Sequence, residues 1–294
     1  MKPESVSSGW TKLHHKADAV MKIWIQAKAR LPKIASLLLA GMLCGQQATA
    51  EPLTPIAEPG RAAIGIIIDD LGNLRDRDLR AIHLPAAVTY AFLPHTPHAR
   101  ELANLAHRLD KEVMLHLPME AVDHNRLGPG GLTLGMNRQQ FLRQLRDNIA
   151  AVPHVAGINN HMGSLLTQNL GYMRWLMQEL DGHDALYFVD SYTTKASVAV
   201  KAANENWVPN IRRDVFLDSD RDREKIRAEL QRTVRLAREH GIALAIGHPY
   251  PETLDVLEQE LPRLAAEGVA ILPVSQLLDQ HMQRFRTWRA FLSP

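Results

Sequence analysis

The sequence predicts an α/β fold in which parallel strands close, or nearly close, into a barrel with helices outside. From residue 63 onward, short apolar runs alternate with longer amphipathic stretches. This alternation is typical of repeated strand–helix units, whose strands are parallel. Seven or eight apolar runs have the length of strands, and that number favours a barrel over an open sheet.

In the first half of this region, each strand is predicted from a β-branched or aromatic run and each helix from an apolar face. Residues 64–68, which are isoleucine except for one glycine, have the pattern of a fully buried strand. Residues 99–109 place their leucines on one face of a helix. Further strands are predicted over 87–93, 112–115 and 155–158, further helices over 74–82, 138–151 and 170–180, and a long glycine-rich loop over 125–137.

The second half continues the same alternation. Residues 222–240 carry opposite charges at i,i+4 spacing and are followed by Gly241, a residue that commonly ends helices. The remaining predicted strands are 186–189, 215–217, 242–246 and 269–273, and the remaining predicted helices are 198–206 and 253–267.

The first fifty residues are expected to be an export signal. A basic segment precedes an apolar stretch over 34–45, and Ala48-Thr49-Ala50 has the small-residue pattern of a cleavage site. Met21 begins a more ordinary signal than Met1 does. We therefore expect an irregular lead-in over 51–62, one domain over 63–294, no membrane span after cleavage and a periplasmic location. The alternative is an uncleaved signal that anchors the chain in the membrane.

Charge and cysteine content narrow the function classes. Residues 1–50 hold seven of the 34 basic and two of the 32 acidic residues, so 27 basic and 30 acidic residues remain. This balance, without a long basic run, argues against nucleic-acid binding. The one cysteine, Cys44, lies in the apolar stretch of the signal, so the rest of the chain is stabilised without disulfides. The oligomeric state is left open.

Polar and titratable residues recur where the predicted strands end. Because the carboxyl ends of parallel strands meet at one rim, we expect these side chains to form one site. They are Asp69, Asp70, His95, His116, Glu120, Asn159, Asn160, His161, Asp190, Ser191 and His248.

Two adjacent carboxylates, Asp69 and Asp70, repel each other and lose solvation at such a place. A divalent metal would compensate them, with one Asp as ligand and the other as base; the alternative is a helix cap. Asp and His together suit zinc or a similar ion. A metal site of this kind indicates hydrolysis of an amide or ester. A glycosidase is disfavoured because its two acids lie further apart.

Five motifs give the chain a specific resemblance: Ile67-Ile68-Asp69-Asp70-Leu71-Gly72, His116-Leu117-Pro118-Met119-Glu120, Asn159-Asn160-His161-Met162-Gly163-Ser164, Val189-Asp190-Ser191 and Ile246-Gly247-His248-Pro249. Over nearly all of residues 62–280 the chain resembles the divergent polysaccharide deacetylases, a branch of the carbohydrate esterase superfamily with a NodB-like fold. The resemblance implies a distorted (β/α) barrel of about seven strands. It also implies a metal-dependent hydrolase that removes an acyl group from an envelope polysaccharide, and the first acyl group to expect is N-acetyl.

The resemblance also implies roles for individual residues. Asp69 corresponds to the base, Asp70 and His116 to metal ligands, His248 to the general acid and Asp190 to a supporting acid. Ordinary members have a second His ligand where this chain has Glu120, so His161 is inferred to be the third ligand, with Glu120 as the competing candidate.

The remaining candidates are expected to orient the site or to contact substrate: Asn159, Asn160, Glu120, His95 and Ser191. Since two family positions differ here, the rival hypothesis is an inactive envelope protein that binds glycan with the same barrel. The retained Asp69 and His248 favour an enzyme.

Overall fold

The strands form one sheet in which every neighbouring pair is parallel. The computed structural model describes residues 62–123, 125–183 and 186–282. Their strand order is β6-β5-β4-β3-β2-β1-β8-β7, with β9 beside the start of β1. The strands are β1 (Ala63–Leu71), β2 (Thr89–Phe92), β3 (Glu112–Met119), β4 (Val155–Met162), β5 (Tyr187–Asp190), β6 (Asn210–Arg212), β7 (Val215–Phe216), β8 (Ile242–Gly247) and β9 (Ala270–Ile271).

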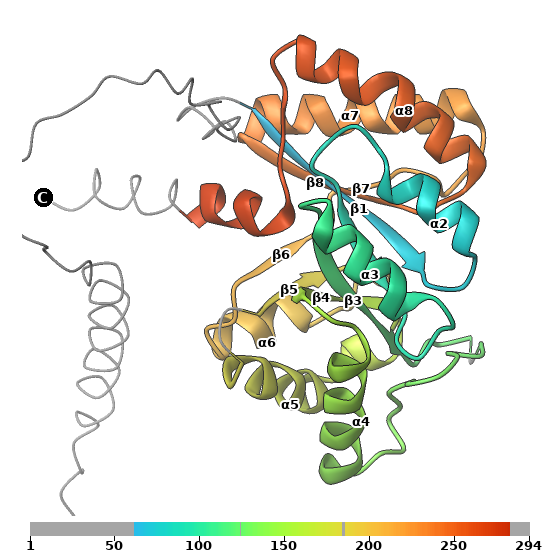
Figure 1. Cartoon of the computed structure of the whole chain (residues 1–294). Coiled ribbons are helices and arrows are strands. Elements are labelled where there is room, and N and C mark those ends of the chain that lie inside the picture. Colours follow the sequence, from blue (N-terminus) through green and yellow to red (C-terminus); the bar gives the residue numbers. More distant parts are fainter. Residues whose placement is uncertain (1–61, 124, 184–185, 283–294) are drawn as a thin grey trace, which may run out of the picture. The chain divides into compact units, whose positions relative to one another are not determined.

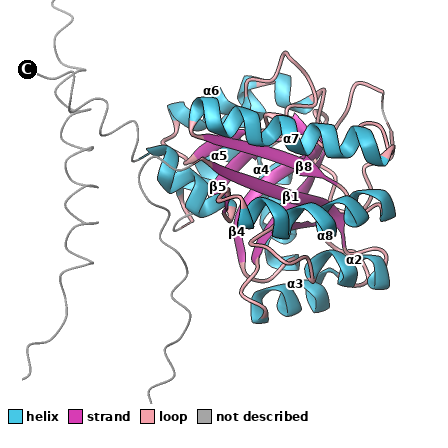
Figure 2. Cartoon of the chain, turned by 90° about the horizontal axis from the view of Figure 1, so that it is seen from above, coloured by secondary structure: helices cyan, strands magenta, loops and turns pink. Residues whose placement is uncertain are grey.

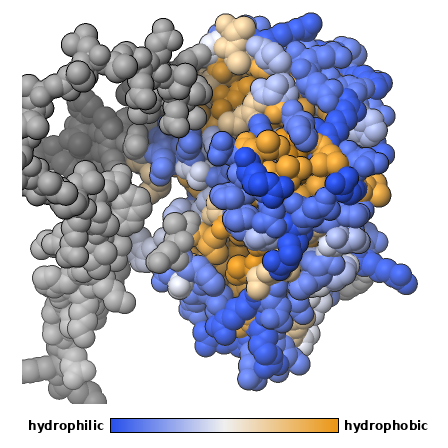
Figure 3. All heavy atoms as spheres, in the orientation of Figure 1, coloured by the Kyte–Doolittle hydropathy of each residue, from blue (hydrophilic) through white to orange (hydrophobic). Residues whose placement is uncertain are grey.

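Helices cover the outer face of this sheet (Figures 1 and 2). The long helix α7 packs on β8 and β1, while α4 and α6 contact β3 and β5. Hydrophilic residues cover most of the surface seen in Figure 3, with apolar residues exposed between them. The helices are α2 (Arg75–Ile82), α3 (Ala99–Arg108), α4 (Arg138–Ala151), α5 (Leu170–Asp181), α6 (Ala199–Glu205), α7 (Arg223–His240) and α8 (Pro251–Ala266), with a 3-10 turn at η1 (Leu166–Gln168).

The sheet curls so that its two edge strands, which do not pair with each other, are joined by a short link. Edge strand β6 ends at Arg212 and edge strand β7 begins at Val215, so three peptide units, about 11 Å at most, join the edges. The linking residues bond to both sides: Arg213 N donates to Asp190 O on β5, and Asp214 N donates to Leu244 O on β8. The predicted distorted parallel barrel is thereby confirmed.

Alternate residues of β1 serve two different apolar cores. Ile64, Ile66 and Ile68 pack into the cluster between sheet and helices. Ala63 and Ile67 belong to a second cluster inside the barrel, which also takes up Val274, Leu277 and Leu278 from helical residues 274–282. This two-residue period assigns each strand position to the outer or the inner face.

Most predicted elements are present, with shifted ends. The prediction that the site residues follow their strands was wrong for most of them, because the strands continue past their apolar runs. The residues that lie within strands are Asp69 and Asp70 on β1, His116 on β3, Asn159, Asn160 and His161 on β4, and Asp190 on β5. Helix α8 begins at Pro251, earlier than predicted. Strand β6 and helical residues 274–282 were not predicted. The expected export signal lies outside the described residues, and no described helix has the length and apolarity needed to cross a membrane.

Candidate metal centre and acid–base site

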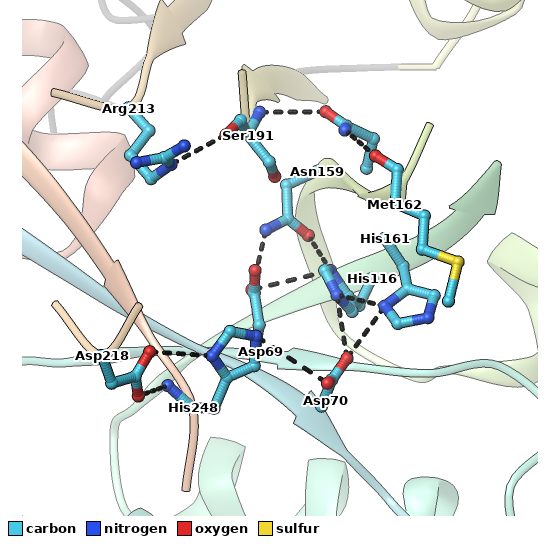
Figure 4. A network of polar contacts seen from close by, with 11 residues as sticks. Asp69, Asp70, His116, Asn159, His161, Met162, Ser191, Arg213, Asp218 and His248 are labelled. Atoms are coloured by element: carbon cyan, nitrogen blue, oxygen red, sulfur yellow. Dashed lines mark hydrogen bonds and ion pairs between the residues drawn. The ribbon is translucent and has the colours of Figure 1, made fainter. Parts of the chain in front are cut away.

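The inner face of the barrel changes character along its length. Towards the amino ends of the strands it carries the second apolar cluster. Further along the same strands, inner-face positions carry Asp69 on β1, His116 on β3, and Asn159 and His161 on β4 (Figure 4). Their two-residue spacing from Ile67, Met114 and Gly157 places all four side chains at one end of the barrel. Register therefore brings residues far apart in sequence to one place.

A β-bulge lets Asp69 and Asp70 reach the same site. The pairing of β1 with β2 shifts between Ile68 and Leu71, and Asp70 has a left-handed φ of 61°. In a regular strand these two neighbours would point to opposite faces, whereas a bulge re-aims a side chain. Both carboxylates consequently contact His116: Asp69 Oδ1 lies 3.6 Å from Nδ1, and Asp70 Oδ1 lies 3.2 Å from Nε2.

Left-handed non-glycine residues recur at the carboxyl ends of other strands. His95 after β2, Met162 at the end of β4 and Tyr192 after β5 have φ values of 58°, 53° and 53°. Such conformations are costly for residues with a Cβ and concentrate at functional sites. At these positions, Asp70 included, the left-handed backbone coincides with the polar rim, whereas Asp110, His154 and Trp207 have the same conformation elsewhere.

Three ligand atoms form a nearly equilateral triangle. Asp70 Oδ1 lies 2.9 Å from His161 Nδ1 and 3.2 Å from His116 Nε2, and the two ring nitrogens are 3.1 Å apart. A tetrahedral ion with bonds of about 2.0–2.1 Å would hold its ligand atoms about 3.3 Å apart. Asp70 Oδ1 is buried and makes no hydrogen bond of good geometry among the described residues. The donor set therefore fits a divalent cation such as zinc.

Asn159 fixes the orientation of both the base candidate and the His116 ring. Its Nδ2 donates to Asp69 Oδ1 at 2.7 Å, since an ionised carboxylate can only accept. Its Oδ1 then accepts from His116 Nδ1, also at 2.7 Å. With its proton on Nδ1, a neutral His116 presents the lone pair of Nε2 to Asp70 and His161, as a metal ligand must.

Burial and neighbouring charges shift the pKa values of these groups in the metal-free protein. Burial raises the pKa of Asp69 above its ordinary value, although the charge of His116 acts against it. Burial would raise the pKa of Asp70 as well, but the His116 and His161 rings hold it well below its usual range. Burial would lower the pKa of His116, but the charges of Asp69 and Asp70 raise it to about 9.

His248, directly after β8, faces this cluster and is held by Asp218. The His248 Nδ1 lies 2.9 Å from Asp218 Oδ1, and the His248 backbone N donates to Oδ2 at 2.6 Å. Thr253 donates to the same Oδ2. His248 Nε2 remains on the side of Asp70 Oδ2, 3.8 Å away. Burial would lower the pKa of His248, but the hydrogen bond and charge of Asp218 raise it.

A cleft of about 480 Å³ opens beside these residues, and Asp70, His161 and His248 line it. Pro94 and Tyr250 also contribute to its lining. Asp69 and His116 lie deeper, with relative exposures of 3% and 2%. A substrate in the cleft would thus meet the metal-ligand candidates at its base.

Two predicted site residues act on the loops around the cluster. Asn160 Oδ1 accepts from Ser191 N at 2.9 Å, and Asn160 Nδ2 donates to Met162 O at 2.6 Å. Asp190 was expected to support the base or acid, but its carboxylate accepts from Tyr192 N and Ser197 Oγ. Asp218, not Asp190, contacts the general-acid candidate. The structure therefore brings Asp190 to the rim without joining it to Asp69 or His248.

Glu120, His95 and Ser191 lie outside the three-ligand cluster. Glu120 Oε2 accepts from Leu134 N at 2.7 Å and so ties down the long loop before α4. His95 Nε2 lies 3.0 Å from Asn148 Oδ1. The Ser191 hydroxyl is buried and has no hydrogen-bond partner among the described residues. His161 and Glu120 were the competing candidates for the third ligand, and the structure places the His161 ring nitrogen, and not Glu120, beside Asp70 and His116.

Sequence reasoning missed the contribution of Asp218, and it predicted a structural ion pair for Arg213 but not its contact with Ser191. Asp218 follows the short apolar run 215–217, the same strand-end signal that identified the other candidates. Arg213 Nε donates to Ser191 O at 2.8 Å across the seam between the sheet edges, and its guanidinium lies over the Phe216 ring. No sequence pattern would have revealed that contact, because it depends on how the barrel closes.

Comparisons with known proteins show the family of the chain and relatives of its fold. Residues 66–278 match the profile of the family described as divergent polysaccharide deacetylase. The chain is 38% identical over 217 residues to the uncharacterized protein YibQ of Escherichia coli, covering 74% of this chain and 67% of that protein. An uncharacterized protein of Haemophilus influenzae is 34% identical over 204 residues, covering 69% and 72%. The crystal structure of an uncharacterized Agrobacterium tumefaciens protein shares the fold, with a TM-score of 0.73 at 22% identity over 76% of this chain and 92% of that one.

Proposed function

Because the chain belongs to the divergent polysaccharide deacetylase family, we propose that it is a metal-dependent hydrolase that removes an acyl group, foremost N-acetyl, from an envelope polysaccharide. The observation that carries the proposal is the triangle of ligand atoms from Asp70, His116 and His161, with the base candidate Asp69 and the acid candidate His248 next to it. A non-catalytic binding protein has no need for that second pair.

Asp70, His116 and His161 would hold the cation, whose chemistry is to polarise the acyl carbonyl and to lower the pKa of a water. Asp69 is the base that accepts the proton of the attacking water. Its Oδ1 accepts a hydrogen bond from Asn159 Nδ2, which leaves Oδ2 for that proton. Burial raises its pKa in the metal-free protein, and a carboxylate with a higher pKa is a stronger base.

His248 is the acid that protonates the leaving amine. Its Nδ1 is hydrogen-bonded to Asp218 Oδ1, so its Nε2 carries the proton that is transferred. The hydrogen bond and charge of Asp218 raise the pKa of His248 and so keep more of it protonated near neutral pH. The base and the acid are thus two different side chains: Asp69 is positioned by Asn159 and His248 by Asp218.

We further propose that the chain acts in the periplasm. The support is the basic segment, the apolar stretch over 34–45 and the small-residue pattern of residues 48–50, which together are typical of a secretory signal.

The test compares matched Asp to Asn variants of the full chain. Asp70→Asn is expected to lose bound zinc and acetate release from N-acetylglucosamine oligomers together. Asp69→Asn is expected to keep zinc and to lose activity by about 10²–10⁴-fold. Asp76→Asn, on the exposed face of α2, serves as the control and should change neither property.

The outcomes separate the hypotheses. Wild-type zinc content in Asp70→Asn would contradict the ligand assignment, and wild-type activity in Asp69→Asn would contradict the base assignment. If the wild type binds zinc and glycan but releases no acetate, the chain is a binding protein.

A further inference from the structure

The cleft beside the ligand residues is rich in cationic groups. Among the described residues that line it, Asp70 is the only carboxylate, whereas Arg77 and Arg126 contribute guanidinium groups. A cation bound by Asp70 would also neutralise that carboxylate. The lining then carries an excess of positive charge that the hydrolysis of a neutral acyl-sugar does not require.

Arg77 is held in place by a buried partner that leaves most of its guanidinium free. Its Nε lies 3.3 Å from Asp78 Oδ1. Asp78 is fully buried: its Oδ2 accepts from Gly72 N and Leu74 N in the turn after Asp70, and its Oδ1 forms the ion pair with Arg77. The two Nη groups of Arg77 have no partner among the described residues. A guanidinium anchored at one nitrogen loses less conformational entropy when it binds an anion.

Arg126 is an exposed cation without a hydrogen-bond or ion-pair partner among the described residues. Its segment is tied to the fold by Asn148 Nδ2, which donates to Gly130 O at 2.8 Å. Many exposed arginines elsewhere pair with carboxylates, for example Arg75 with Glu101. Near the mouth of the cleft, Arg126 therefore remains available to a ligand.

A third guanidinium, that of Arg221, stacks on a residue of the lining without lining the cleft itself. Arg221 Cζ is 3.7 Å from the centre of the Tyr250 ring, and Tyr250 lines the cleft. Stacking on the ring holds this cation without consuming its hydrogen-bond donors.

We propose that the cleft selects a glycan that carries an anionic group, a carboxylate or a phosphate, which Arg77 and Arg126 bind while the acyl group lies at the metal-ligand residues. The inference rests on the proposed function and specifies its substrate class. Guanidinium groups match the planar geometry of carboxylates and the oxygens of phosphates, and they bind both with charge-assisted hydrogen bonds.

The experiment measures binding, so it does not depend on turnover. The full zinc-loaded chain carrying Asp69→Asn, which leaves the ligands intact, is titrated calorimetrically with three disaccharides. These are the neutral N,N′-diacetylchitobiose, its 6-phosphate, and the disaccharide of N-acetylglucosamine and N-acetylmuramic acid, which adds one carboxylate. At least one anionic disaccharide is expected to bind about three- to tenfold more tightly than the neutral disaccharide, and the one preferred identifies the anion.

Variants then locate the preference. Arg126→Gln, which breaks no described contact, and Arg77→Gln should each reduce it, and the double variant should abolish it. Arg77→Lys should retain part of it. Arg108→Gln, an exposed residue at the end of α3, is the control and should leave it intact. Equal affinity for all three disaccharides, no measurable binding, or a preference that survives in the double variant would each overturn the proposal.

This result is separable from the proposed function. A charge-dependent preference without acetate release by the wild type keeps the inference and rejects the hydrolase. Acetate release without a charge preference keeps the hydrolase and rejects the inference about the anionic group.

Discussion

At the scale of single residues, the left-handed conformation of Asp70 is the feature on which the site most depends. Its φ of 61° costs about 1–2 kcal/mol for a residue with a Cβ. In return, the bulge directs two consecutive carboxylates to one place, one as ligand and one as base. Strain of this kind persists because the strands on both sides of β1 fix the backbone.

Replacing Asp218 by Asn tests the acid at this scale. The variant keeps the side-chain volume but removes the charge that raises the pKa of His248. We expect kcat to fall by about 10²-fold. The alkaline limb of the kcat–pH profile should move to lower pH, because His248 then loses its proton at a lower pH. Zinc content should stay unchanged, and Asp220→Asn, an exposed neighbour, is the control. An unmoved alkaline limb would argue against His248 as the acid.

Asn159→Leu tests how the ligand ring is positioned. Without the amide, Asp69 and the Nδ1 of His116 lose the partner that joins them, and the ring no longer has a fixed tautomer. Zinc affinity is expected to fall about 10–100-fold, as measured by competition with a chelating dye. An affinity within twofold of the wild type would show that Asn159 has no positioning role.

Which residues could be predicted depended on whether they interrupt an apolar run. Asp69, His116 and His248 stand where such a run stops and His161 three residues after one, so their convergence followed from the parallel topology. The partner of His248 could not be predicted, because Asp190 and Asp218 both come directly after a short apolar run in the sequence. Only side-chain direction, which depends on the curl of the barrel, distinguishes them.

At the scale of elements, helices were predicted more accurately than strands. Helix α4 has the predicted limits because Asn137 forms a capping box with Gln140 at its start. Strands were predicted too short because hydrogen-bonded pairing continues where the inner face becomes polar. Strand β6, with the polar sequence Asn-Ile-Arg, offered no apolar pattern at all.

A pair of glycine substitutions tests packing between β4 and β5. A Cβ at Gly157 would lie 2.3 Å from the Tyr187 ring, whereas a Cβ at Gly135 would meet nothing closer than 3.9 Å. Gly157→Ala should therefore lower the free energy of unfolding by about 1–3 kcal/mol. Gly135→Ala should leave it nearly unchanged. Denaturant unfolding followed by circular dichroism measures both, and equal midpoints would contradict the packing described here.

At the scale of the whole molecule, the metal-ligand candidates join β1, β3 and β4. A cation bound only by the folded chain stabilises it by about 2.7 kcal/mol at a free concentration 100 times its Kd. For a domain of this size, Tm should rise by about 5–10 °C. Scanning calorimetry with zinc and with a chelator measures the difference, and Asp70→Asn should show none. A chelator-sensitive Tm in that variant would indicate a different metal site.

The position of β1 also has a consequence in time. The strand that carries Asp69 and Asp70 is the first in the described fold, yet its neighbour β8, which precedes His248, is one of the last. During synthesis or refolding, the early strand must wait for a partner separated by most of the domain, and closing such long loops slows folding. The site that combines the metal ligands with the acid His248 would thus form only after β8 has paired with β1. Zinc binding next to a positioned His248 would therefore indicate that the whole domain has folded.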